Sequence, residues 1–163
     1  MNRLLARRVA VAGITLSLVF APLAPAQDKA SAKDKEPILL QSLGALTGVY
    51  LFQTHTTLGM IHDGKAKGVF DDTVAKHQLF TIINMANLVD KQLALAGKAG
   101  LNKDDQQAFE TFRSVNAQLQ REAMLLKKVW ESKDKKDEAA FAKQRAETFA
   151  KIANLLGIQQ KKG

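Results

Sequence analysis

Residues 109–130, FETFRSVNAQLQREAMLLKKVW, carry the clearest structural signal in this chain. Because apolar side chains recur here every three or four residues, they would line one face of a helix. The stretch therefore predicts a long amphipathic helix, over about residues 102–131, that packs into a core through a single stripe. That stripe consists of Phe109, Phe112, Val115, Leu119, Ala123, Leu126 and Trp130.

Three further segments have helical patterns, at about residues 38–62, 71–96 and 137–156. Pro37 suits the first turn of the first helix, and Asp71 or Asp72 suits the cap of the second. No segment alternates apolar and polar residues as a half-buried strand would. Because the connections are short, we predict an all-α fold, a four-helix up-down-up-down antiparallel bundle. The predicted buried face of the second helix is Val74, Leu79, Ile82, Met85, Ala86, Val89, Leu93 and Ala96.

The first 26 residues have the composition of a secretory signal peptide. Three arginines precede an apolar run over residues 9–20, and Ala24 and Ala26 form an A-x-A cleavage site. The run is too short to cross a bilayer as a helix, which needs about 20 residues. We therefore expect cleavage after Ala26 and export, to the periplasm or out of the cell. The arginine pair at residues 7–8 leaves the choice between general and twin-arginine export open.

The remaining chain is expected to be a polar, flexible lead over residues 27–36, followed by one bundle domain over residues 37–163. The whole chain has 24 Lys+Arg and 16 Asp+Glu. Since the signal peptide holds three arginines and no acid, the rest carries 21 − 16, or +5. These charges are spread over helix faces without a dense basic stripe, so no nucleic-acid partner is expected.

Several chemistries of helical proteins lack their residues here. The chain has no cysteine, which excludes disulfides, iron–sulfur clusters, thiol catalysis and covalently attached haem. No Glu is followed by His three residues later, as di-iron bundles require. Phosphate loops, G-x-S-x-G and H-E-x-x-H are also missing. We therefore expect a protein that is not an enzyme and that requires no cofactor.

The first helix is unusual because residues 37–61 include no Asp, Glu, Lys or Arg. Gln and Thr residues within it make a membrane span costly, so no integral span is expected. Its glycines and two histidines fall within an arc of about 60°. They would either let another helix approach closely, in the bundle or in a second copy, or line a groove for a ligand. The residues on this arc are Gly44, Gly48, His55, Gly59 and His62.

Two candidate sites follow from these histidines. A polar ligand pocket would use His55, His62, Tyr50 and Thr54. A metal site would use His62, Asp63 and Asp72, because imidazole and carboxylate are common ligands of transition metals. The simpler interpretation is that the aspartates cap a helix, that the histidines belong to ordinary polar surface and that the threonines bond to carbonyls one turn back in their own helix.

Glu122 and Arg145 lie at matching distances from the predicted turn between the last two helices. They would form an ion pair, either directed inward or, as we expect, partly solvated at the rim. The sequence as a whole predicts a structural or protein-interaction module, with residues 38–62 contacting a second copy or another protein. The alternative is a carrier of a small ligand, a metal or haem that uses the histidines of this helix.

Overall fold

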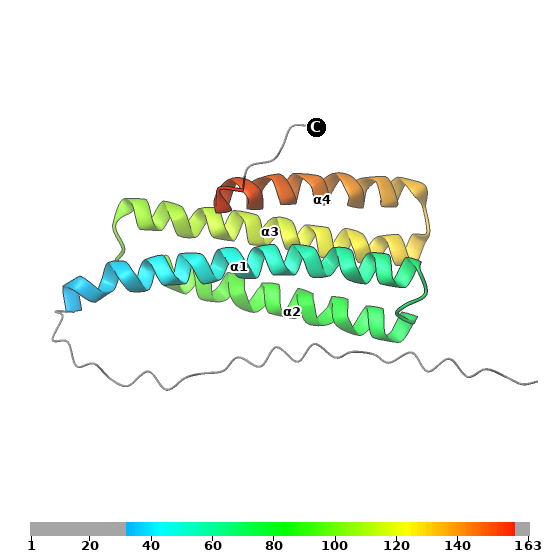
Figure 1. Ribbon diagram of the computed structural model, residues 1–163, viewed down its shortest axis with the longest axis horizontal. Helices are drawn as coiled ribbons and strands as arrows, with labels where there is room; N and C mark the ends of the chain where they lie inside the picture. The colour runs from blue at the N-terminus through cyan, green and yellow to red at the C-terminus, as the bar shows by residue number, and fades with distance from the viewer. Residues whose placement is uncertain (1–31, 159–163) are drawn as a thin grey trace, which may run out of the picture. The chain divides into compact units, whose positions relative to one another are not determined.

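The computed structural model describes residues 32–158, which form four helices and, within that range, no strand (Figure 1). The all-α class and the four helices expected from the sequence are confirmed. Within the described range, none of the helices combines the length and the apolar character that crossing a membrane requires. The predicted signal peptide and its cleavage site lie outside the described residues. The helices are α1 (Ala32–Ala66), α2 (Asp72–Ala96), α3 (Lys103–Ser132) and α4 (Lys135–Leu156).

Helix α1 begins earlier than the sequence predicts. The expected start at Pro37 is wrong, because the helix begins at Ala32 and Pro37 lies inside it. Residues 32–36, part of the predicted lead, are therefore helical. Proline tolerates this position because the only bond its ring removes is the one to the carbonyl of Lys33, near the helix end. Alanine, lysine and glutamate in the preceding residues also favour helix.

Capping side chains set the starts of the other helices. The Asp71 carboxylate accepts a hydrogen bond from the Val74 amide at 2.8 Å, as predicted for one of the two candidate caps. Asn102 caps α3 by accepting from the Asp105 amide at 2.9 Å. Asp134 caps α4 by accepting from the Lys136 amide, and the helix begins at Lys135, two residues before the predicted start. Each cap satisfies one of the amides left free at a helix start.

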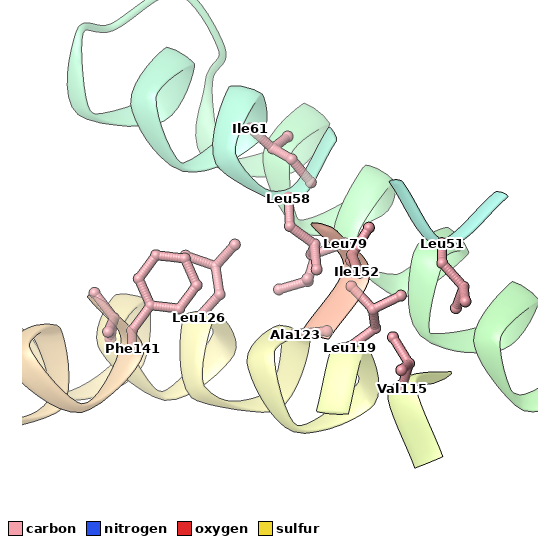
Figure 2. Packing of buried hydrophobic residues seen from close by; sticks show 11 residues of the cluster. Leu51, Leu58, Ile61, Leu79, Val115, Leu119, Ala123, Leu126, Phe141 and Ile152 are labelled. Carbon is pink, nitrogen blue, oxygen red and sulfur yellow. The ribbon is translucent and has the colours of Figure 1, made fainter. Parts of the chain in front are cut away.

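The core forms where α1 and α3 pack together, with α2 and α4 on either side of that pair and out of contact with each other. Figure 2 shows its central side chains, drawn from all four helices. The predicted α3 stripe is confirmed for Phe109, Val115, Leu119, Ala123 and Leu126, all of which are buried. The cluster comprises Leu51, Leu58, Ile61, Leu79, Val115, Leu119, Ala123, Leu126, Val129, Phe141 and Ile152.

The predicted buried face of α2 is partly wrong. Leu79, Ala86 and Leu93 are buried as expected, but Val74 and Met85 are exposed. The physical reason is that α2 contacts only α1 and α3. A helix with two neighbours buries a narrow stripe, and the rest of its apolar residues stay at the surface.

Candidate functional site

The most polar part of the interior is a charged cluster formed by His55 of α1, Glu122 of α3 and Arg145 of α4. His55 Nδ1 lies 3.0 Å from Glu122 Oε2. Arg145 Nη1 donates to Glu122 Oε1 at 3.3 Å and to the backbone carbonyl of His55 at 3.1 Å. Glu122 is 0% exposed and His55 is 5% exposed. The cluster therefore joins three helices through one carboxylate.

The predicted Glu122–Arg145 pair exists, but its expected solvation is wrong. Glu122 is fully buried rather than placed at the rim, although the Arg145 side chain keeps 33% of its surface exposed. Glu122 follows Leu119 by three residues and precedes Leu126 by four, so it continues the apolar stripe of α3. That spacing indicates in the sequence that Glu122 faces the core. It does not indicate the third partner, His55, which lies 67 residues away in the chain.

Small and aromatic residues shape the space around this cluster. A Cβ atom added to Gly59 would overlap the Arg145 guanidinium, which would have to move away from its present bonds to Glu122 and to the carbonyl of His55. The His55 ring stacks on Phe149, with centroids 5.6 Å apart and planes at 25°. Gly59 lies one helical turn from His55, and Phe149 lies one helical turn from Arg145. Both positions therefore serve the packing of α1 against α4.

The other glycines of α1 also face neighbouring side chains. A Cβ added to Gly48 would lie 2.6 Å from Leu156 Cδ2, and one added to Gly44 would lie 3.6 Å from Phe112. Of the two interpretations of the glycine stripe, the described residues therefore favour close packing within the bundle over an open groove. Because Leu156 is the last residue of α4, α4 covers α1 only as far as Gly48.

Tyr50 and Thr54, predicted as ligand residues, belong to a second polar layer. The Tyr50 hydroxyl donates to Asn116 Oδ1 at 3.4 Å, and Asn116 Nδ2 donates to the carbonyl of Ala86 at 2.8 Å. Burial raises the pKa of the Tyr50 phenol, and its hydrogen bond with the Thr54 side chain partly opposes that rise. Asn116 is fully buried and was missed in the sequence, where it lies beside Val115 without a distinguishing pattern.

His62 joins the end of α1 to the start of α4. Its Nδ1 lies 3.1 Å from Asp63 Oδ1 and its Nε2 lies 3.0 Å from Glu138 Oε1, while its ring packs on Phe141. His62 is thus separate from the His55 cluster, and the four predicted ligand residues do not converge on one pocket. The ligand-carrier hypothesis stays a prediction.

The predicted metal set is brought together only in part. His62 and Asp63 are neighbours, but Asp72 instead pairs with Lys65, whose ammonium holds the pKa of that carboxyl below its usual range. Asp72 and His62 line the same shallow hollow of about 410 Å³, together with the cationic Lys65 and Lys133. Over residues 32–158, no three His, Asp or Glu side chains form a group able to hold a metal ion.

The most extensive surface feature is a set of exposed apolar side chains on α1 and α2. The two helices enclose a groove of about 410 Å³, lined by Leu43 and Leu46 of α1 and by Val89 and Gln92 of α2 among others. Large apolar residues along these two helices are exposed to solvent rather than buried. We call them the α1–α2 face; they are Ile38, Leu39, Leu43, Leu46, Val49, Phe52, Met60, Val74, Met85, Leu88 and Leu95.

This exposure depends on which sides of the two helices have neighbours. Val49, Phe52 and Met60 are exposed although they lie on the part of α1 that α4 contacts, and α2 does not contact α4. The N-terminal part of α1 extends past the end of α4 (Figure 1), so the turns before Gly48 lack the neighbour that covers the later ones. The sequence showed that residues 37–61 of this helix are uncharged, but it could not show which side of them is exposed. Comparisons with protein-family models, curated proteins and solved structures gave no match. Function is therefore inferred from the residues themselves.

Proposed function

We propose that this chain is an exported, non-enzymatic helical-bundle protein that acts as a structural or protein-interaction module through the α1–α2 face. The observation that carries the proposal is the exposure of apolar side chains along a helix without charged residues from 37 to 61. Many exposed apolar side chains on two neighbouring helices are typical of binding sites rather than of free protein surface. Lone exposed leucines would need no such explanation.

The buried cluster supports a structural role rather than catalysis. Glu122 is fully buried, and its two oxygens already face Arg145 and His55. A substrate could reach this carboxylate only if the packing of α1 against α4 opened. We infer that the cluster fixes the alignment of three helices, and that the chemistry of the protein lies in recognition at its surface.

We also propose that the bundle has the up-down-up-down topology expected from its short connections. The contacts between α1 and α4 support this, because residue numbers fall along α1 as they rise along α4, as expected for antiparallel helices. The pairs are His62 with Glu138, Gly59 with Arg145, His55 with Phe149 and Gly48 with Leu156. The same trend relates α2 to α3, through Asp90 with Arg113 and Ala86 with Asn116.

Export to the periplasm or out of the cell is the proposed setting for this module. It rests on the signal-peptide pattern of the first 26 residues and agrees with a chain that has no cysteine to be oxidised. An exported chain without disulfides depends on packing for its stability. The glycine-dependent contacts of α1 with α4 provide such packing.

A photo-reactive amino acid placed at Val49 in the producing cell tests the proposed function. Val49 is 64% exposed on the α1–α2 face. Lys143 on α4, whose side chain is 79% exposed, is the matched control. We expect a covalent adduct from position 49 and none from position 143. Equal yields at the two positions, or no adduct at either, would contradict an interaction module that uses this face.

A further inference from the structure

We propose that the partner bound at the α1–α2 face is a second copy of this chain, related by a two-fold axis that passes near Val49. This inference rests on the proposed function and names the partner of the same face.

The exposed side of α1 has the spacing of a helix–helix seam. Six of its residues follow one another by alternating steps of four and three, the pattern by which one helix packs along another in a coiled coil. None is charged, and two are small enough to let a partner helix approach. Val49 lies near the middle of the row, which consists of Ile38, Ser42, Ala45, Val49, Phe52 and Thr56.

The area of the face matches what a stable dimer needs. Residues 38–60 of α1 span about 35 Å at 1.5 Å per residue. Two neighbouring helices, about 9 Å apart and about 10 Å across, are roughly 20 Å wide. The footprint is thus about 700 Å² per copy, close to the roughly 800 Å² per partner of a standard protein interface. A single helix would offer about half that area.

Charge also favours this face for self-association. Residues 27–163 carry a net charge of +5, so two copies repel each other on average. On α3 and α4, exposed lysines such as Lys127 and Lys143 would meet in a symmetric contact. The row on α1 brings no such group to the interface, because residues 37–61 include neither acid nor base. Along this row two copies can therefore meet without opposing like charges, and the exposed Lys91 of α2, one helical turn from Leu88 and Leu95, lies outside the row.

Three threonine hydroxyls on this face tolerate burial against protein. The hydroxyls of Thr56, Thr57 and Thr81 already donate to carbonyls one turn back in their own helices, at 3.0, 2.8 and 3.0 Å. Burial would leave none of these donors unpaired. A helix that lies in a membrane surface instead uses Lys or Arg and aromatic anchors beside its apolar face. α1 lacks those basic residues between Pro37 and Ile61, so a second copy fits better than a lipid surface.

Sedimentation equilibrium of the chain, expressed from Met1 and purified in the form that accumulates, tests this inference. We expect a dimer with a dissociation constant of about 1 μM or tighter, the weak limit for interfaces of standard size. Val49→Lys should weaken the dimer at least about tenfold, since it opposes two charges across the seam. Met124→Lys, at a residue of α3 that is 52% exposed, is the control and should leave the dimer intact.

Several results would overturn the inference. A wild-type chain that stays monomeric, or a dimer that Val49→Lys leaves unchanged while both variants remain folded by circular dichroism, contradicts it. A monomer that sediments with phospholipid vesicles, and loses this binding in Val49→Lys, would assign the face to a membrane. A monomer whose photo-adduct at position 49 contains a different protein would also overturn the second copy, yet it would leave the interaction module standing. No adduct at all would remove both proposals.

Discussion

Replacing Arg145 with Met is expected to destabilise the bundle by about 3 kcal/mol, because the buried Glu122 carboxylate then keeps only His55 as a side-chain partner. Arg145 Nη1 is the group bonded to Glu122 Oε1, and Glu122 has no exposed surface. Removing one partner of a buried ion pair costs about 3–5 kcal/mol in other proteins. We expect the lower end of that range, because the exposed third of the Arg145 side chain shows that water lies nearby.

A second substitution separates this effect from lost packing. In the double variant Arg145→Met with Glu122→Gln, the buried group is a neutral amide that still faces His55. The double variant should therefore lose only about 1–2 kcal/mol, the cost of weakened hydrogen bonds. Glu122→Gln would thus recover part of the stability lost in Arg145→Met. Substitutions at independent sites instead have additive effects on the free energy of unfolding.

Urea unfolding at neutral pH, followed by far-ultraviolet circular dichroism, measures these free energies for the wild type, both single variants and the double variant. Coupling of about 2 kcal/mol or more is expected between the two sites. If the loss in the double variant equals the sum of the losses in the single variants, Glu122 does not depend on Arg145. The account of a charge cluster that aligns three helices would then be refuted.

Three further predictions test other contacts. Gly59→Ala should destabilise the fold by about 1–3 kcal/mol because the added Cβ overlaps the Arg145 guanidinium. In the control Gly44→Ala the added Cβ lies 3.6 Å from Phe112, so this change should be neutral or stabilising by up to about 1 kcal/mol. Equal effects of the two substitutions in urea unfolding would contradict this. Tyr50, the only tyrosine, should ionise above pH 10.0 in the folded state because burial raises its pKa. The contribution of Tyr50 to stability is then fully present below pH 10.0 and is lost as pH rises through the folded pKa. An ultraviolet titration of the folded protein with the same midpoint as the one in urea would contradict this. Hydrogen bonds from Lys128 and Ser132 lower the pKa of Asp137 from 3.8. The contribution of Asp137 to stability is therefore present above pH 3.8 and is lost as pH falls through the folded pKa. Acid unfolding that is unchanged by Asp137→Asn would count against this contribution.

The helices themselves could be predicted from the sequence because their information is local. Apolar spacing of three and four residues located the α3 stripe, and Asp71 was recognisable as a cap from its place before the next apolar run. The start of α1 could not be predicted in this way. Pro37 resembles a first-turn proline, and nothing local shows that the helix continues upstream of it.

The candidate site depended on contacts between distant parts of the chain. Glu122 is fully buried where His55 and Arg145 approach it from two other helices. Gly59 matters because the Arg145 guanidinium lies against it, and Arg145 is 86 residues away in the chain. The α1–α2 face is similar. A helical segment without charges can be buried on every side. The outer side of residues 37–61 is exposed here because α2, α3 and α4 pack against the other sides of α1. Sequence periodicity cannot show which sides of a helix will have neighbours.

Thiol labelling in the producing cell tests most directly whether the α1–α2 face is occupied. The chain has no cysteine, so Val49→Cys and Lys143→Cys each introduce a single thiol on an exposed surface of the isolated bundle. If a partner covers the face, the thiol at position 49 should react with a maleimide at least about tenfold more slowly than the one at position 143, and the two rates should converge after unfolding. Equal rates in the folded protein would show that the face is open to solvent and would contradict the proposed interaction module.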